Sequence, residues 1–163
     1  MAGKHLKLLD NTTEAAFKAG FKAINIELEP LTVPVAAHTY QRLSVDGVEF
    51  ATGRQLKRDA QIVFYQMGED NLVPGVIDVI LSIEKNGKEV FVLGVRKRKP
   101  AVGCKSNPFS RFQEFGAEIW SQSIERQITY IPLTRPIYHT QSMRWESETM
   151  VLKPIKPVRY HPC

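Results

Sequence analysis

The chain has 163 residues, of which 43% are hydrophobic and 24% are charged, and its formal net charge is +5. This length and apolar content suffice for one domain with a conventional buried core. With two cysteines and no apolar run near the roughly 20 residues that span a bilayer, a disulfide scaffold and a transmembrane helix are excluded.

A short helix over residues 12–23 is the first element that the sequence predicts. Asn11 and Glu14 have the spacing of a capping box, in which each side chain accepts a hydrogen bond from a free backbone N–H group. Pro30 and Pro34 follow, and proline is excluded from a central strand because it has no N–H donor. We therefore expect an N-terminal helix and linker over residues 1–37, and one main domain over residues 38–163.

From residue 38 onward the sequence alternates between apolar and polar residues, as β-strands do. Two alternating segments, Tyr40–Val45 and Val48–Ala51, are joined by the dipeptide Asp46-Gly47. A dipeptide of this kind favours a tight turn, so the segment predicts a β-hairpin.

The most strongly predicted structure is a β-meander between residues 61 and 95. Its strands are Gln61–Gln66, Val76–Ile83 and Val90–Val95. Asn86-Gly87 separates the second strand from the third and accepts the positive φ angles of a hairpin turn. Four consecutive cations, Arg96 to Lys99, follow the third strand directly, which places a positive charge at the rim of the sheet.

Two interpretations fit the segment from residue 109 to residue 120. Apolar side chains recur there at intervals near three to four, which is typical of one face of a helix, but a helical turn that leads into a strand fits as well. Three short strands are predicted after it: Ile128–Ile131, Pro136–His139 and Thr149–Leu152. The predicted fold class is mainly β: a small curled sheet or a partly open, SH3-like β-barrel, with a short N-terminal helix.

An enzymatic interpretation rests on Asp78 and Glu84, which lie on or beside predicted strands. Metal-dependent nucleases use two carboxylates to hold a metal ion and a lysine to position the attacking water. Lys85 follows Glu84 directly, so it points to the opposite face of the strand and away from such a site. Charges at the end of a hairpin explain these residues more simply, and the nuclease is kept as an alternative.

Neither a metal site nor a cofactor site is predicted. Cys104, His139, His161 and Cys163 are potential zinc ligands, but only the last two are close together, whereas structural zinc sites take ligands in close pairs. The sequence has no glycine-flanked nucleophile and no glycine-rich nucleotide-binding loop. We therefore expect a protein that is not an enzyme.

Basic and aromatic residues are the candidate contacts with a partner. The basic candidates for binding nucleic acid or another acidic partner are Arg54, Lys57, Arg58, Arg96, Lys97, Arg98, Lys99 and Lys105. A solvated strand end is the simpler explanation of the cations. The aromatic candidates are Tyr65, Trp120 and Trp145, although aromatic residues within strands usually belong to the core. Trp145 lies among charged residues, so we expect it at the surface.

The order of these motifs resembles a bromo-adjacent homology (BAH) domain, a β fold of chromatin proteins. The resemblance covers about residues 38–157. It rests on soft apolar patterns in Asp59–Tyr65, Pro74–Ile83, Val90–Arg98, Phe112–Ser121 and Ile128–Ile131. A similar pattern occurs in small C-terminal domains of transposon-encoded proteins, which resemble the chain at Asn107-Pro108-Phe109 and Arg111-Phe112.

The resemblance and the basic cluster together imply a non-enzymatic module that binds a chromatin protein or a nucleic acid, with no membrane partner. Since the N-terminal sequence has neither a secretory nor a transit pattern, we expect it in the nucleus or the cytoplasm. The alternatives are the metal-dependent nuclease and a scaffold or interaction segment of a transposon-derived or viral polypeptide. The sequence leaves the oligomeric state open.

Overall fold

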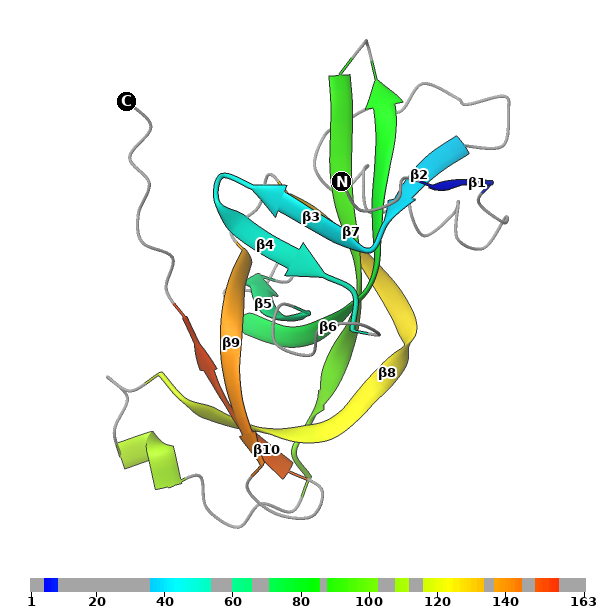
Figure 1. Ribbon diagram of the computed structural model, residues 1–163. Coiled ribbons are helices and arrows are strands. Elements are labelled where there is room, and N and C mark those ends of the chain that lie inside the picture. The colour runs from blue at the N-terminus through cyan, green and yellow to red at the C-terminus, as the bar shows by residue number, and fades with distance from the viewer. Residues whose placement is uncertain are drawn as a thin grey trace.

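The computed structural model describes residues 5–8, 36–53, 60–65, 71–85, 88–102, 108–111, 116–133, 137–144 and 149–155. Within this part of the chain, all regular structure is β-strand except for one 3-10 turn, which confirms the mainly β class (Figure 1). The helix predicted over residues 12–23 lies outside the described residues.

The described elements follow one another in a simple order along the chain. They are β1 (His5–Leu8), β2 (Ala36–Tyr40), β3 (Arg42–Val45), β4 (Val48–Ala51), β5 (Gln61–Tyr65), β6 (Leu72–Lys85), β7 (Lys88–Pro100), η1 (Pro108–Arg111), β8 (Glu118–Pro132), β9 (Ile137–Arg144) and β10 (Thr149–Pro154).

One curled sheet contains eight of these strands, in the order β1-β2-β6-β5-β9-β10-β8-β7. Strand β6 also pairs with β7, so the pairings that leave β6 through β5, β9, β10 and β8 return to it through β7 (Figure 1). Strands β3 and β4 form a separate hairpin beside this sheet. The sheet can curl because β6, β7 and β8 are long and irregularly paired, and bulges bend strands.

The predicted meander and the predicted hairpin are both confirmed. Strand β5 pairs with β6, and β6 pairs with β7 out to Lys85 opposite Lys88, although both long strands extend beyond their predicted bounds. In the β3–β4 hairpin, Asp46 and Gly47 have φ angles of 50° and 77°. Positive φ at both central residues is the requirement of a type I′ turn, which the dipeptide meets.

The segment before the C-terminal strands corrects one of the two interpretations. A 3-10 turn ends at Arg111 and a strand begins at Glu118, so a helix that continues to Trp120 is wrong and the turn that leads into a strand is confirmed. Strand β8 then runs to Pro132 and includes the short strand predicted at its end. Strands β9 and β10 are confirmed with shifted bounds.

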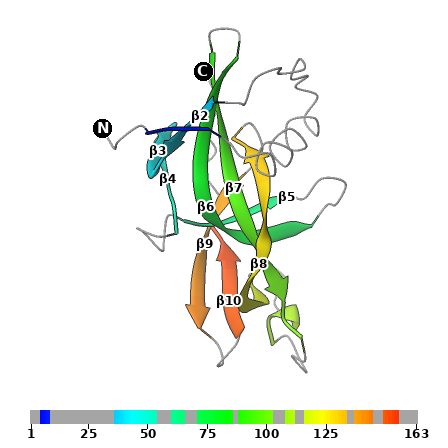
Figure 2. The same cartoon turned by 90° about the vertical axis from the view of Figure 1, so that its right-hand side faces the viewer.

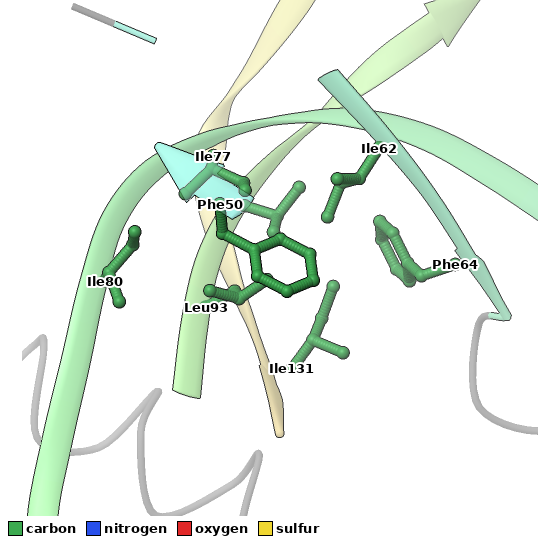
Figure 3. Close-up of a cluster of buried hydrophobic side chains, with 8 residues drawn as sticks. Phe50, Ile62, Phe64, Ile77, Ile80, Leu93 and Ile131 are labelled. Atoms are coloured by element: carbon green, nitrogen blue, oxygen red, sulfur yellow. The ribbon is translucent and has the colours of Figure 1, made fainter. Parts of the chain in front are cut away.

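Apolar side chains on the two faces of the β6–β7 ribbon form two separate clusters. The inner cluster lies within the curl of the sheet, where Leu93 meets side chains of β4, β5, β6 and β8 (Figure 3). It comprises Phe50, Ile62, Phe64, Ile77, Ile80, Leu93, Val95 and Ile131. The outer cluster comprises Ala37, Leu81, Ile83, Val92 and Tyr130. Since successive side chains of a strand point to opposite faces, this ribbon is buried on both sides.

An irregularity at Asp78 aligns β6 with both clusters. The pairing with β7 passes from Ile77 opposite Val95 to Val79 opposite Gly94, so Asp78 is one extra residue in β6. The inner cluster therefore contains Ile77 before the bulge and Ile80 after it, although these residues are three positions apart. A bulge shifts the alternation of side chains by one residue, so residues after it point to the opposite face from the one that strict alternation predicts.

The lower end of the sheet has the opposite character. Strands β9 and β10 continue past the core as a ribbon with β8 (Figure 2). Four consecutive residues of β9, from Gln141 to Arg144, are exposed, so both faces of the strand meet solvent there. Among them Met143 is 56% exposed.

Candidate basic interface

The four consecutive cations lie within β7, after its buried segment, and they do not form one patch. Their environments differ because successive side chains leave a strand on opposite faces. Arg98 is buried and Lys99 is exposed, while Arg96 and Lys97 are half-buried. The structure thus divides a cluster that the sequence presents as one unit.

The prediction that Arg98 belongs to the binding surface is wrong. Its side chain is only 9% exposed, and its guanidinium forms hydrogen bonds inside the protein. One of its Nη atoms donates to the backbone oxygen of Gln122 at 3.0 Å, and the other lies 3.5 Å from the Gln61 side-chain oxygen. Burial lowers the pKa of Arg98 from its ordinary value, since a desolvated charge is disfavoured. Arg98 therefore connects β7 to β8 and β5, which is a structural role.

The place of Arg98 explains why its hydrogen bonds matter. The pairing of β7 with β8 passes from Arg96–Ile128 to Arg98–Ile124 and then to Pro100–Trp120, so β8 has two extra residues at each step. Regular ladder hydrogen bonds are lost in such irregular pairing. The guanidinium supplies a donor to one carbonyl of this stretch.

Arg96 is also engaged, in this case by a carboxylate. Its Nη2 atom lies 3.1 Å from Oδ2 of Asp78, and the two side chains are 34% and 27% exposed. The bulge that inserts Asp78 into β6 places this carboxylate beside β7. The two opposite charges cancel, so the pair has almost no net charge to attract an acidic partner.

Lys97 and Lys99 of β7 and Arg126 of β8 lie on adjacent strands, and we call these three residues the basic surface below. Lys97 is half-buried, and Lys99 and Arg126 are exposed. Arg126 lies in the stretch of β8 between the residues that pair with Arg96 and Arg98, so it is on the strand next to Lys97. The sequence analysis missed Arg126, because the β7–β8 register depends on bulges that leave no signal in the sequence.

The structure describes only some of the other residues that the sequence predicts as contacts. Arg54, Lys57, Arg58, Lys105 and Trp145 lie outside the described residues. Tyr65 ends β5. Trp120 is half-buried in β8, and its indole N–H donates to Oε2 of Glu118 at 2.9 Å. The aromatic residues are not gathered into a described site.

The two carboxylates of the nuclease alternative lie on one strand, six residues apart. That separation corresponds to about 20 Å of extended strand, whereas two ligands of one metal ion lie within a few ångströms of each other. Asp78 is paired with Arg96, and the described residues contain no group of three histidine, cysteine or acidic side chains able to hold a metal ion. The geometry offers no support for this alternative.

Among the potential zinc ligands, only His139 is described. Its ring stacks on Phe50 with centroids 5.2 Å apart and rings inclined by 29°. Cys104, His161 and Cys163 lie outside the described residues. Packing against the inner cluster explains His139 without a metal ion.

No family model, curated protein or solved structure matches the chain. In the described ranges, no helix has the length and apolar character required to cross a membrane. The function must therefore be argued from the surface itself.

Proposed function

We propose that the chain is a non-enzymatic binding module of BAH-like type, which recognises an acidic partner through the basic surface. The partner is a chromatin protein or a nucleic acid. The proposal rests on one observation: past Val95, β7 carries Lys97 and Lys99, and the adjacent strand β8 carries the exposed Arg126. Lysine and arginine on adjacent strands suit phosphates or carboxylates.

Acidic residues lie near the basic surface, so we expect the protein to contact its partner at a few separate points. Glu118 and Glu125 lie on the same strand as Arg126, and Asp78 neutralises Arg96 nearby. A surface that follows a nucleic-acid backbone over a long distance is uniformly positive, and this one is mixed. If three cations contact duplex DNA, the slope of log K against log salt concentration is about −3.

A binding assay with matched variants tests the proposal. The triple variant Lys97→Gln, Lys99→Gln and Arg126→Gln is compared with the wild type in fluorescence anisotropy against duplex DNA, single-stranded RNA and reconstituted nucleosomes. We expect a loss of affinity of at least about tenfold for one of these probes, since three charge-assisted contacts are removed.

A second variant separates the basic surface from net charge. Arg42→Gln removes an exposed cation from β3, where Arg42 lies 3.8 Å from Glu49, outside the proposed interface. We expect it to bind as the wild type does. The proposal is contradicted if the wild type binds none of the three probes, or if Arg42→Gln weakens binding as much per charge as the triple variant does.

A further inference from the structure

A polar network connects three strands at the opposite end of β7 from the basic surface. It is formed by Tyr40 of β2, Ser82 of β6 and Glu89 of β7. The Tyr40 hydroxyl donates to Oε1 of Glu89, and Oγ of Ser82 lies 2.6 Å from the same oxygen. Oγ of Ser82 also lies 3.2 Å from the Tyr40 hydroxyl. One carboxylate therefore accepts hydrogen bonds from hydroxyl groups of two other strands.

The network lies between the core and the solvent. Ser82 is 0% exposed, and the half-buried ring of Tyr40 meets Phe91 at a centroid distance of 5.6 Å. Glu89 is exposed, so its carboxylate exchanges protons with the solvent. A buried hydroxyl needs a hydrogen-bond partner, because an unsatisfied polar group inside a protein is destabilising. The protonation state of an exposed residue is thus felt inside the core.

Strand β2 is attached to the sheet over a short distance. Its pairing with β6 covers three residues, from His38 opposite Ser82 to Tyr40 opposite Ile80 (Figure 2). Strand β1 pairs with β2 and with no other described strand, so both strands depend on this attachment. The hydrogen bond from Tyr40 to Glu89 extends the attachment past β6 to β7.

The strength of the hydrogen bonds in this network depends on the charge of Glu89. A hydrogen bond to an ionised acceptor is roughly twice as strong as one between neutral groups. Protonation of the carboxylate weakens both bonds at once, because both hydroxyl groups donate to it. The attachment of β2 is therefore strongest while Glu89 is ionised, and it weakens as the pH falls and the carboxylate takes up a proton.

We propose that Glu89 is an acid-sensitive switch that controls how firmly β1 and β2 are attached to the sheet. The ionised carboxylate holds β2 against β6 and β7, and the protonated form lets it open more often. Ala37 of β2 is 0% exposed and belongs to the outer cluster together with Leu81. Opening of β2 therefore brings apolar side chains of the outer cluster into contact with solvent.

Other titratable and charged residues surround Glu89. Glu84 lies directly opposite it in the β6–β7 register, and Lys85 and Lys88 form the next pair. His38 of β2 lies opposite the serine of β6 that donates to Glu89. Histidines ordinarily titrate near about pH 6.5 and glutamates near about pH 4.3, while lysines keep their charge at both values. The switch belongs to Glu89 because both hydroxyl groups donate to its carboxylate, so Glu84→Gln and His38→Gln should each retain it.

Hydrogen exchange observed by NMR on the full chain tests the proposal. Protection factors of the backbone amides of residues 36–40 are measured at about pH 7, 5.5 and 3.5, a range that separates histidine from glutamate. Each value is corrected for intrinsic exchange at that pH and compared with residues 62–64 of β5. In the wild type, we expect the protection of β2 relative to β5 to fall at least about threefold between the two lower pH values.

Matched variants identify the group that is responsible. Glu89→Gln keeps the shape of the side chain and removes its titration, so β2 should show the low acid value of the wild type at every pH. Tyr40→Phe and Ser82→Ala each remove one donor and should reduce the fall in protection. Glu118→Gln is the control, since Glu118 is an exposed carboxylate that accepts a hydrogen bond from Trp120 on β8. It should leave the fall unchanged.

Three results would overturn the proposal. The first is a wild-type protein in which the protection of β2 changes in parallel with that of β5 at every pH. The second is a fall in protection that persists in Glu89→Gln, which would assign the titration to another group. The third is a fall of wild-type size in both Tyr40→Phe and Ser82→Ala, which would show that the hydroxyl groups do not transmit the effect.

Discussion

The middle of the β6–β7 ribbon and the free end of β9 have the same secondary structure and opposite surroundings. Leu93 and its neighbours are buried on both faces of their ribbon, whereas residues 141–144 are exposed on both faces of theirs. Stability is therefore concentrated in the first region. The second contributes less to stability, because the loss of its exposed side chains leaves no cavity in the core.

The largest expected effect tests the buried side of this comparison. Leu93→Ala removes a side chain that is 0% exposed in the inner cluster, and should lower the free energy of unfolding by about 2–5 kcal/mol in urea denaturation. Met143→Ala should change it by less than about 0.5 kcal/mol. Similar losses of unfolding free energy for the two variants would contradict the conclusion that stability is concentrated in the β6–β7 ribbon.

A methyl group added to the same ribbon should also destabilise it. A Cβ at Gly94 would lie 2.5 Å from Cγ1 of Val79, and 3.1 Å from both Ile128 and Tyr130. Gly94→Ala should therefore cost about 1–3 kcal/mol of unfolding free energy. The double variant with Val79→Ala should lose less than the sum of the two single losses, because it removes the clashing methyl groups. Additive losses would show that the clash is not the cause.

The third prediction sharpens the boundary where β7 changes from core to surface. Arg98→Ala leaves the Gln122 carbonyl without its charged donor and should cost about 2 kcal/mol in thermal or urea unfolding. Lys99→Ala, one residue along, should stay within about 0.5 kcal/mol of the wild type. Equal losses of unfolding free energy would contradict the conclusion that Arg98 is structural and Lys99 is not.

The smallest effect is expected at the bulge. Asp78→Asn keeps the shape of the side chain but removes the charge that pairs with Arg96, and should cost less than about 1 kcal/mol. Because the pair is partly exposed, the loss should shrink when unfolding is repeated at high salt. A loss that is large and independent of salt would indicate that the carboxylate has a buried structural role.

Much of the fold could be predicted from the sequence, because its signals are local. Alternation of apolar residues identified β5, β6 and β7, and Asp46-Gly47 identified its hairpin turn through the φ angles that it accepts. The length of β8 could not be predicted in this way. Apolar spacing near three to four from residue 109 fits a helix and a strand with bulges equally well, and only the partners β7 and β10 decide between them.

The basic surface was harder to predict than the strands. Four consecutive cations indicated a positive region, but the burial of Arg98 and the pairing of Arg96 depend on the curl of the sheet and on Asp78 in the neighbouring strand. Arg126 belongs to this region because β8 pairs with β7, and the sequence of either strand alone does not reveal that pairing. The pairing between strands determines which charged side chains face a partner, and the sequence of a single strand does not show that pairing.

The extra residue at Asp78 has a consequence for how this gene can vary. An in-frame deletion of that codon would join Ile77 directly to Val79, so the pairing with Val95 and Gly94 would become regular and each later side chain of β6 would keep its present face. Both clusters would then keep their present side chains. Loss of Asp78 should therefore be tolerated among natural variants more readily than loss of Ile77 or Ile80, each of which would remove a buried side chain.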